Sequence, residues 1–212
     1  MAETGIAVII AIGDYLNATD NDTFNSKVNE LVGLQTKMWG PKNMGYKLIA
    51  LDEKCGYLSK NSLLDFIKET RFSINNNNYD YLVINIIGKG NEEYLITSDK
   101  QNISWLKIYE LFSFDFKFFV PTVINIDVFN PENDANNRFE SVDVDCYGDN
   151  LNVFGYSSMN IDYFGFITKV LLQRKNAIHL KDVINHIMIW NKYIFTVPKD
   201  IDFDELWPIY QS

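Results

Sequence analysis

Cysteine and histidine, the commonest nucleophile and base of cysteine chemistry and frequent metal ligands, are scarce in this 212-residue chain. The sequence contains two cysteines, Cys55 and Cys146, and two histidines, His179 and His186. A thiolate beside an imidazole can attack a peptide carbonyl near neutral pH, but neither cysteine is close to a histidine in the sequence. Two isolated cysteines also form no disulfide framework, and two histidines without a nearby carboxylate favour packing over metal binding. We therefore expect no metal and no cofactor.

Three other short segments stand where a site would be expected, because each ends a run of apolar and β-branched residues. They are Gly13-Asp14-Tyr15, Gly88-Lys89-Gly90 and Asp127-Val128-Phe129. If the runs are strands of a parallel sheet, their carboxyl ends lie at the edge of the sheet where ligands bind in α/β proteins. These segments are the candidate site.

The elements that would position this site alternate along the chain. Strands are expected at 6–12, 46–51, 79–87, 118–128, 151–157 and 193–197, and helices at 26–39, from a cap at Ser59 or Asn61, at 104–111, at 164–172 and at 180–190. Asn75–Asn78 is expected to form a loop tip, and 130–150 a long loop. Such alternation predicts one α/β domain over 1–212, with a mostly parallel six-stranded sheet between layers of helices.

Composition and charge exclude several classes of function. The formal net charge is −9, and no basic patch is visible, so binding to nucleic-acid phosphates or to anionic lipid is not expected. The longest apolar runs, at 5–13 and 81–88, are shorter than the roughly 20 residues that span a bilayer. The acidic start of the chain does not match a signal peptide. The sequence therefore predicts a cytoplasmic protein that binds neither membrane nor nucleic acid.

The order of these segments resembles that of the caspase-like cysteine peptidases, and more closely the metacaspase and paracaspase branch. The resemblance lies in "AIGDYLNATDND", "YLVINIIGKGNEEYLITSD" and "VINIDVFN", and it extends over residues 6–197. It implies a three-layer caspase-like sandwich in which 130–150 corresponds to the linker between large and small subunits. Four acids of that loop, Glu140, Asp143, Asp145 and Asp149, form either a solvated surface or, as near this region in some metacaspases, a calcium site.

The residues that match the catalytic residues of the family are of other types in this chain. Gly88 and Gly90 match the glycines that flank the general base, but Lys89 stands in place of its histidine. Asp127 matches the acid two residues before the nucleophile, while Phe129 stands in place of the cysteine. Phenylalanine has neither a lone pair nor a proton to transfer, so the resemblance implies an inactive pseudopeptidase.

The resemblance also implies that Lys89 and Asp127 lie close together, because the corresponding strands are neighbours in the family. In some active relatives the matching aspartate helps to hold a basic side chain of the substrate. We therefore expect the Lys89 ammonium to pair with Asp127 as a built-in surrogate for that cation. The alternative is an enzyme that has redeployed the same two residues, with Lys89 as a base or an imine-forming amine.

A protein with this frame and no catalytic dyad is expected to act by binding protein. The partner would be an active caspase-like peptidase or a second copy of the chain. Peptidases of this fold commonly associate through the last strand, which here comprises Tyr193, Ile194, Phe195, Thr196 and Val197. The main-chain groups of such an edge offer a template for pairing.

Overall fold

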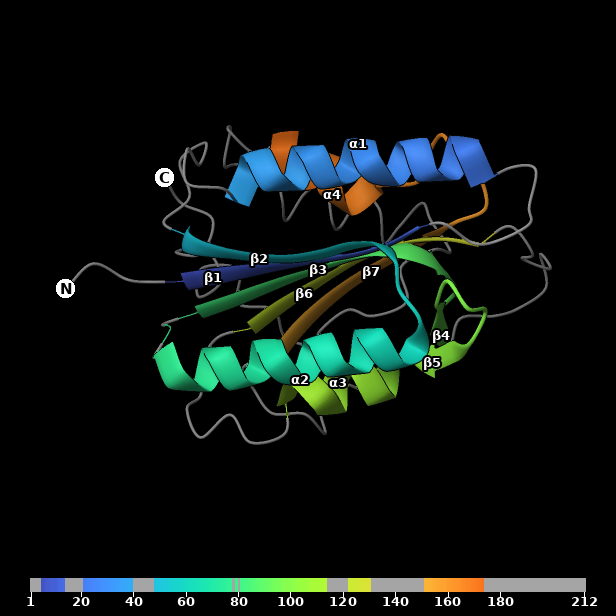
Figure 1. Cartoon of the computed structure of the whole chain (residues 1–212). Helices are drawn as coiled ribbons and strands as arrows, with labels where there is room; N and C mark the ends of the chain where they lie inside the picture. Colours follow the sequence, from blue (N-terminus) through green and yellow to red (C-terminus); the bar gives the residue numbers. More distant parts are fainter. Residues whose placement is uncertain are drawn as a thin grey trace.

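The computed structural model describes residues 5–13, 21–39, 48–77, 79, 81–113, 122–130 and 151–173. A central sheet lies between two layers of helices (Figure 1). One layer contains α1 (Asn21–Trp39) and α4 (Phe166–Gln173), and the other contains α2 (Lys60–Asn77) and α3 (Trp105–Ser113). The predicted three-layer α/β architecture is confirmed.

The sheet has a parallel centre and an antiparallel extension. The parallel strands, in spatial order, are β2 (Leu48–Tyr57), β1 (Gly5–Gly13), β3 (Tyr81–Gly90), β6 (Thr122–Phe129) and β7 (Leu151–Ser158). Two short strands, β4 (Tyr94–Ile96) and β5 (Asn102–Ser104), continue antiparallel from the end of β3. Because the parallel strands all run the same way, β1, β2, β3, β6 and β7 end at one edge, which is called the carboxyl rim below.

The long strands follow the prediction in order, but the strand predicted at 46–51 is wrong at its end, because β2 stays paired with β1 as far as Tyr57 and includes Cys55. The described sheet contains seven strands, because the short strands β4 and β5 are added to the five long ones. The predicted strand at 193–197 and the predicted helix at 180–190 lie outside the described residues. The expected loop at Asn75–Asn78 is wrong for its first part, since the backbone of α2 remains helical to Asn77. At the other end of α2, Ser59 is the cap, and its hydroxyl accepts a hydrogen bond from the Ser62 amide (3.2 Å).

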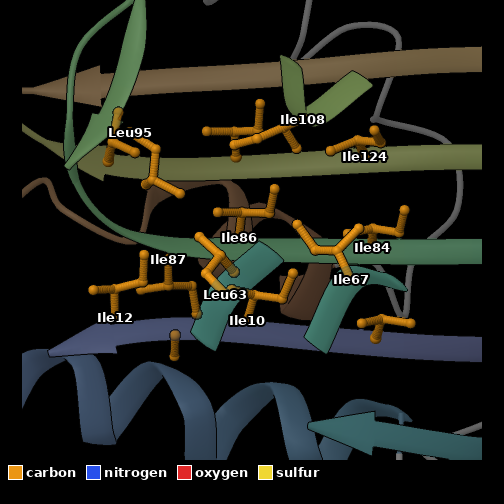
Figure 2. Close-up of a cluster of buried hydrophobic side chains, with 14 of the residues drawn as sticks. Ile10, Ile12, Leu63, Ile67, Ile84, Ile86, Ile87, Leu95, Ile108 and Ile124 are labelled. Atoms are coloured by element: carbon orange, nitrogen blue, oxygen red, sulfur yellow. The ribbon is translucent and has the colours of Figure 1, made fainter. Parts of the chain in front are cut away.

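The two faces of the sheet differ in chemistry. Alternate residues of β1, β3 and β6 pack against α2 and α3 and form an aliphatic core (Figure 2) that includes Ile10, Ile84, Ile124, Leu63 and Ile108. The residues between them face α1 and α4, because side chains alternate along a strand. This second face carries the polar residues Asn85, Asn125 and Asp127, all buried. The candidate site is built on this polar face.

No helix among the described residues is long and apolar enough to cross a membrane.

Candidate functional site at the carboxyl rim

The register of the sheet places the two replaced catalytic positions side by side. Strands β3 and β6 are neighbours, and Lys89 is the register partner of Phe129. Ile87 is in turn the partner of Asp127, two residues earlier on the same face. Adjacent strands lie about 4.8 Å apart, so the two positions have the proximity that a base and a nucleophile need. The strands that end in Lys89 and Phe129 are therefore neighbours, as the resemblance implied.

The side chain of Phe129 belongs to an aromatic cluster that joins three elements. Its ring centroid lies 5.9 Å from that of Phe24 on α1 and 6.2 Å from that of Phe164, which precedes α4. The Phe24 and Phe164 rings are stacked 5.3 Å apart. These distances are those of attractive aromatic pairs. The position of the expected nucleophile is therefore occupied by a packing residue that ties the sheet to the α1 and α4 layer.

Lys89 lies against the same cluster. Its Nζ is 4.9 Å from the centroid of the Phe24 ring, within the range of a cation–π interaction. The face of an aromatic ring favours the protonated ammonium over the neutral amine. Lys89 is therefore packed on the aromatic cluster that contains Phe129.

Asp127 is buried, with 2% of its surface exposed, and its carboxylate is held by α4. The Ile167 amide donates to Oδ1 (2.9 Å), and the amide and hydroxyl of Thr168 donate to Oδ2 (both 2.9 Å). Burial raises the pKa of Asp127 to about 6, because desolvation outweighs these hydrogen bonds and the positive charge of Lys169. The carboxylate thus carries a desolvation penalty that its partners offset in part.

Helix α4 needs this carboxylate because the residue that precedes the helix has no side chain to cap it. The carbonyl of Gly165 accepts the hydrogen bond of the Lys169 amide (3.0 Å), which makes Gly165 the N-cap residue. Glycine has no side chain to cap the helix, and a Cβ here would lie 2.3 Å from Leu31 Cδ2 on α1. The Ile167 and Thr168 amides are at the second and third helical positions, which a capping side chain normally satisfies. Asp127 therefore caps α4 from the neighbouring strand.

A buried chain of hydrogen bonds continues from Asp127 to α1. The Thr168 hydroxyl, which donates to Asp127, accepts a hydrogen bond from Nε2 of Gln35 (2.9 Å). Gln35 is 1% exposed, and Thr168 is fully buried. One polar network thus links β6, α4 and α1. Neither Thr168 nor Gln35 is among the site residues that the sequence predicts.

The predicted ion pair between Lys89 and Asp127 is not among the salt bridges of the described residues. The physical reason is that α4 lies over Asp127 and supplies hydrogen-bond donors to both carboxylate oxygens. The cation whose charge acts on Asp127 is Lys169 of α4. Among the described contacts, the Asp127 carboxylate is thus held by α4 and not by an ion pair with Lys89.

The two glycines of the rim motif have a structural role as well. A Cβ at Gly90 would lie 2.5 Å from the carbonyl oxygen of Tyr94, because β4 turns back directly against the end of β3. Gly88 is buried in β3 opposite Val128. Asp14, which follows β1, lies outside the described residues. The close approach at Gly90 explains the second glycine without any reference to catalysis.

The remaining candidates do not complete a dyad in the described part of the chain. Cys55 is exposed near the end of β2, three strands from Phe129, which corresponds to about 14 Å at the usual strand spacing. Cys146, His179 and His186 lie outside the described residues, as do the acidic loop at 140–149 and the edge at 193–197. Within the described ranges, no group of three or more histidine, cysteine or acidic residues could hold a metal ion.

Comparison with known proteins identifies the fold. No family model matches the chain, and no curated protein matches it. Among solved structures, pro-sf-caspase-1 has a TM-score of 0.55 at 12% identity, over 88% of this chain and 78% of that one.

Two further caspase structures agree with it. Caspase-1 from Spodoptera frugiperda has a TM-score of 0.52 at 11% identity, over 88% of this chain and 75% of that one. The Drosophila initiator caspase Dronc has a TM-score of 0.52 at 12% identity, over 86% and 70%. The α/β sandwich described above is therefore a caspase-like fold.

Proposed function

We propose that this protein is a catalytically inactive caspase-like pseudopeptidase that acts as a protein-binding, regulatory module. The observation that carries the proposal is the packing of Phe129. Its ring stacks with Phe24 and Phe164 at the position where the family has its nucleophile. A phenyl ring can neither attack a carbonyl nor transfer a proton. The assignment to the metacaspase and paracaspase branch rests on the sequence pattern around Asp127.

The neighbouring groups support the same conclusion. Lys89 has a cation–π partner, which opposes the deprotonation that a base or an imine-forming amine requires. Asp127 caps α4 and is buried, so it does not offer a charged carboxylate to a basic substrate side chain. The alternative of an enzyme that uses Lys89 and Asp127 is disfavoured by both contacts.

A binding role is supported by the distribution of exposed apolar side chains. Among the described residues the large exposed ones are Tyr57, Phe72, Leu106, Met159 and Tyr163. Tyr57 ends β2, at the other end of the strand order from β7, whereas Met159 follows β7 and Tyr163 lies in the turn before α4, so two of these five belong to one short segment of the carboxyl rim. Exposed apolar groups that gather on one edge favour a protein partner. We take an active caspase-like peptidase as that partner, in the cytoplasm, without nucleic acid or membrane.

The catalytic part of the proposal is tested by incubating the purified chain with arginine-type and aspartate-type peptide substrates. The expected result is no turnover above buffer. Turnover that a thiol-alkylating reagent abolishes would contradict the proposal, because it would show that a cysteine completes an active site. Trapping of a carbonyl compound on Lys89 by borohydride, lost in Lys89→Met, would instead establish the redeployed enzyme.

The binding part is tested with a purified, active caspase-like peptidase. Addition of the chain should change the turnover of the peptidase, and the double substitution Met159→Ser with Tyr163→Ser should weaken that effect. Phe72→Ser is the matched control, because Phe72 is 72% exposed but lies on α2, away from the rim. An effect that is equal in all three proteins, or absent in all, would refute binding through the rim.

Self-association through 193–197 is a separate prediction of the sequence. The substitution Phe195→Asp should shift a dimer toward monomer in sedimentation at concentrations well above a micromolar dissociation constant. The same sedimentation coefficient before and after the substitution would refute it.

A further inference from the structure

We propose that Asp127, Thr168 and Gln35 form a proton-sensitive latch that fastens the first turn of α4 to the sheet and to α1. This inference is independent of the proposed function, because it concerns the stability of α4 and not the absence of catalysis.

The geometry assigns the latch to a single carboxylate. The Ile167 and Thr168 amides at the start of α4 donate to Asp127. Because Gly165 is the N-cap and has no side chain, Asp127 is the capping group of this helix among the described residues. A movement of α4 away from β6 would leave two amides without their partner and would expose the carboxylate to water.

The Thr168 hydroxyl extends the latch to α1. It has one proton, which it donates to Asp127, and it accepts a hydrogen bond from Gln35. If Asp127 becomes protonated, its new O–H must be donated to an acceptor, and the Thr168 oxygen lies at 2.9 Å from Oδ2. The Thr168 hydroxyl would then reverse its role and release its own proton to another acceptor. The Thr168 oxygen has two lone pairs and then accepts from both Asp127 and Gln35, so α4 stays fastened to β6 and to α1 in the protonated state.

The groups around Asp127 on every neighbouring element set its titration. Lys169 is the charged group of α4 that acts on Asp127, and its charge favours the carboxylate. Helix α1 contributes the neutral Gln35 through Thr168. On the flanking strands, the register partners of Asp127 are Ile87 of β3 and Tyr156 of β7. Lys89 follows two residues after Ile87, with its Nζ over the Phe24 ring.

The direction of the switch follows from linkage. In the closed state burial holds the pKa of Asp127 at about 6, against an ordinary value of 3.8 that the carboxyl regains when α4 opens. The closed state therefore binds the proton more tightly, so acid closes the latch and a rise of pH through 6 loosens it. With these two pKa values, the constant for opening is about tenfold smaller at pH 5 than at pH 7.

Amide hydrogen exchange of the full chain, followed by NMR and corrected for the intrinsic effect of pH, tests the latch. The protection of Ile167 and Thr168 should rise about tenfold from pH 7 to pH 5, and at both pH values it should stay below that of Ile9 in the central strand, which reports global unfolding. Asp127→Asn should abolish the rise. Asp65→Asn, which removes an exposed carboxylate on α2, is the matched control and should keep it.

Two results would overturn the proposal. One is an Asp127→Asn protein whose α4 amides show the same pH dependence as the unmodified chain. The other is protection of Ile167 and Thr168 equal to that of Ile9 at both pH values, which would show that the α4 amides exchange only through global unfolding.

A direct titration covers the case in which Asp127→Asn does not fold. The ¹³C signal of the Asp127 carboxyl should titrate near pH 6 in the unmodified chain, and Thr168→Val should move that midpoint upward, because the lost hydroxyl stabilises the charged form. A midpoint below 4, or one that does not move in Thr168→Val, would refute the latch. Thr168→Ser, which keeps the hydroxyl, should restore the original midpoint.

Discussion

The contact between Gly165 and Leu31 allows a sharp prediction about how α4 is held. The substitution Gly165→Ala meets two separate obstacles. The backbone has φ of +86°, where an L-residue costs about 1–2 kcal/mol more than glycine. The new Cβ would also lie 2.3 and 2.7 Å from the two Cδ atoms of Leu31. Leu31 is completely buried, so relief requires a shift of the core at a cost of about 1–3 kcal/mol.

Together these terms lower the free energy of unfolding by about 2–5 kcal/mol, a large fraction of the total for a domain of this size. Urea unfolding at equilibrium, with the slope and the midpoint fitted separately, measures the change. Gly33→Ala is the matched control, because Gly33 lies in the exposed middle of α1 with nothing within 4 Å of a new Cβ. That substitution should stabilise the protein by about 0.5–1 kcal/mol.

A double-mutant cycle separates the two obstacles. In a Leu31→Ala background the steric obstacle is removed, so Gly165→Ala should cost only its backbone strain, about 1–2 kcal/mol. The reasoning would be refuted if the cost of Gly165→Ala were the same in both backgrounds. It would also be refuted if Gly165→Ala and Gly33→Ala had the same sign.

Three further predictions follow from buried contacts. The Ser98 hydroxyl donates to the Gly13 carbonyl (2.6 Å) and accepts from the Leu58 amide (2.9 Å). Ser98→Ala should therefore lower the free energy of unfolding, measured in urea titrations, by about 1–3 kcal/mol. An unchanged free energy of unfolding would refute this role. Phe129→Ala should cost about 1–3 kcal/mol through lost aromatic contacts, measured in the same way, and should not create peptidase activity. The pKa of Asp127 is raised to about 6, so the free energy of unfolding of the unmodified chain should fall by up to about 3 kcal/mol, relative to that of Asp127→Asn, as the pH rises from 4 to above 6. Thermal unfolding at each pH measures this change, and a fall on acidification would contradict the sign.

The sequence predicted those parts of the fold that depend on long patterns. Runs such as 5–13 and 81–90 are apolar over the full length of a buried strand, so periodicity alone identifies them. The three-residue strands β4 and β5 are too short to show any period. Their positions are set by pairing with β3 and by the Gly90 turn, which are tertiary effects.

The candidate site was predictable in its layout but not in its contacts. The register that brings Lys89 beside Phe129 follows from the order of the strands. The partner of Asp127 depends instead on where α4 lies, which no local pattern encodes. One signal was present: Gln35 and Thr168 are polar residues on the inward faces of their helices, and buried polar groups need partners.

The role of Asp127 connects the proposed absence of catalysis with the stability of the fold. A carboxylate that binds the cation of a substrate must present at least one oxygen to the incoming group. Here Oδ1 accepts from Ile167, Oδ2 accepts twice from Thr168, and the side chain is 2% exposed. Binding of a substrate cation would therefore require α4 to give up its cap, at a cost of about 0.5–2 kcal/mol for the cap alone. Restoring a cysteine at 129 and a histidine at 89 would leave this obstacle in place, so we expect the double substitution Lys89→His with Phe129→Cys to remain without turnover on arginine-type peptides. Turnover by that variant would show that α4 leaves Asp127 readily, and would refute the assignment of Asp127 as a structural cap.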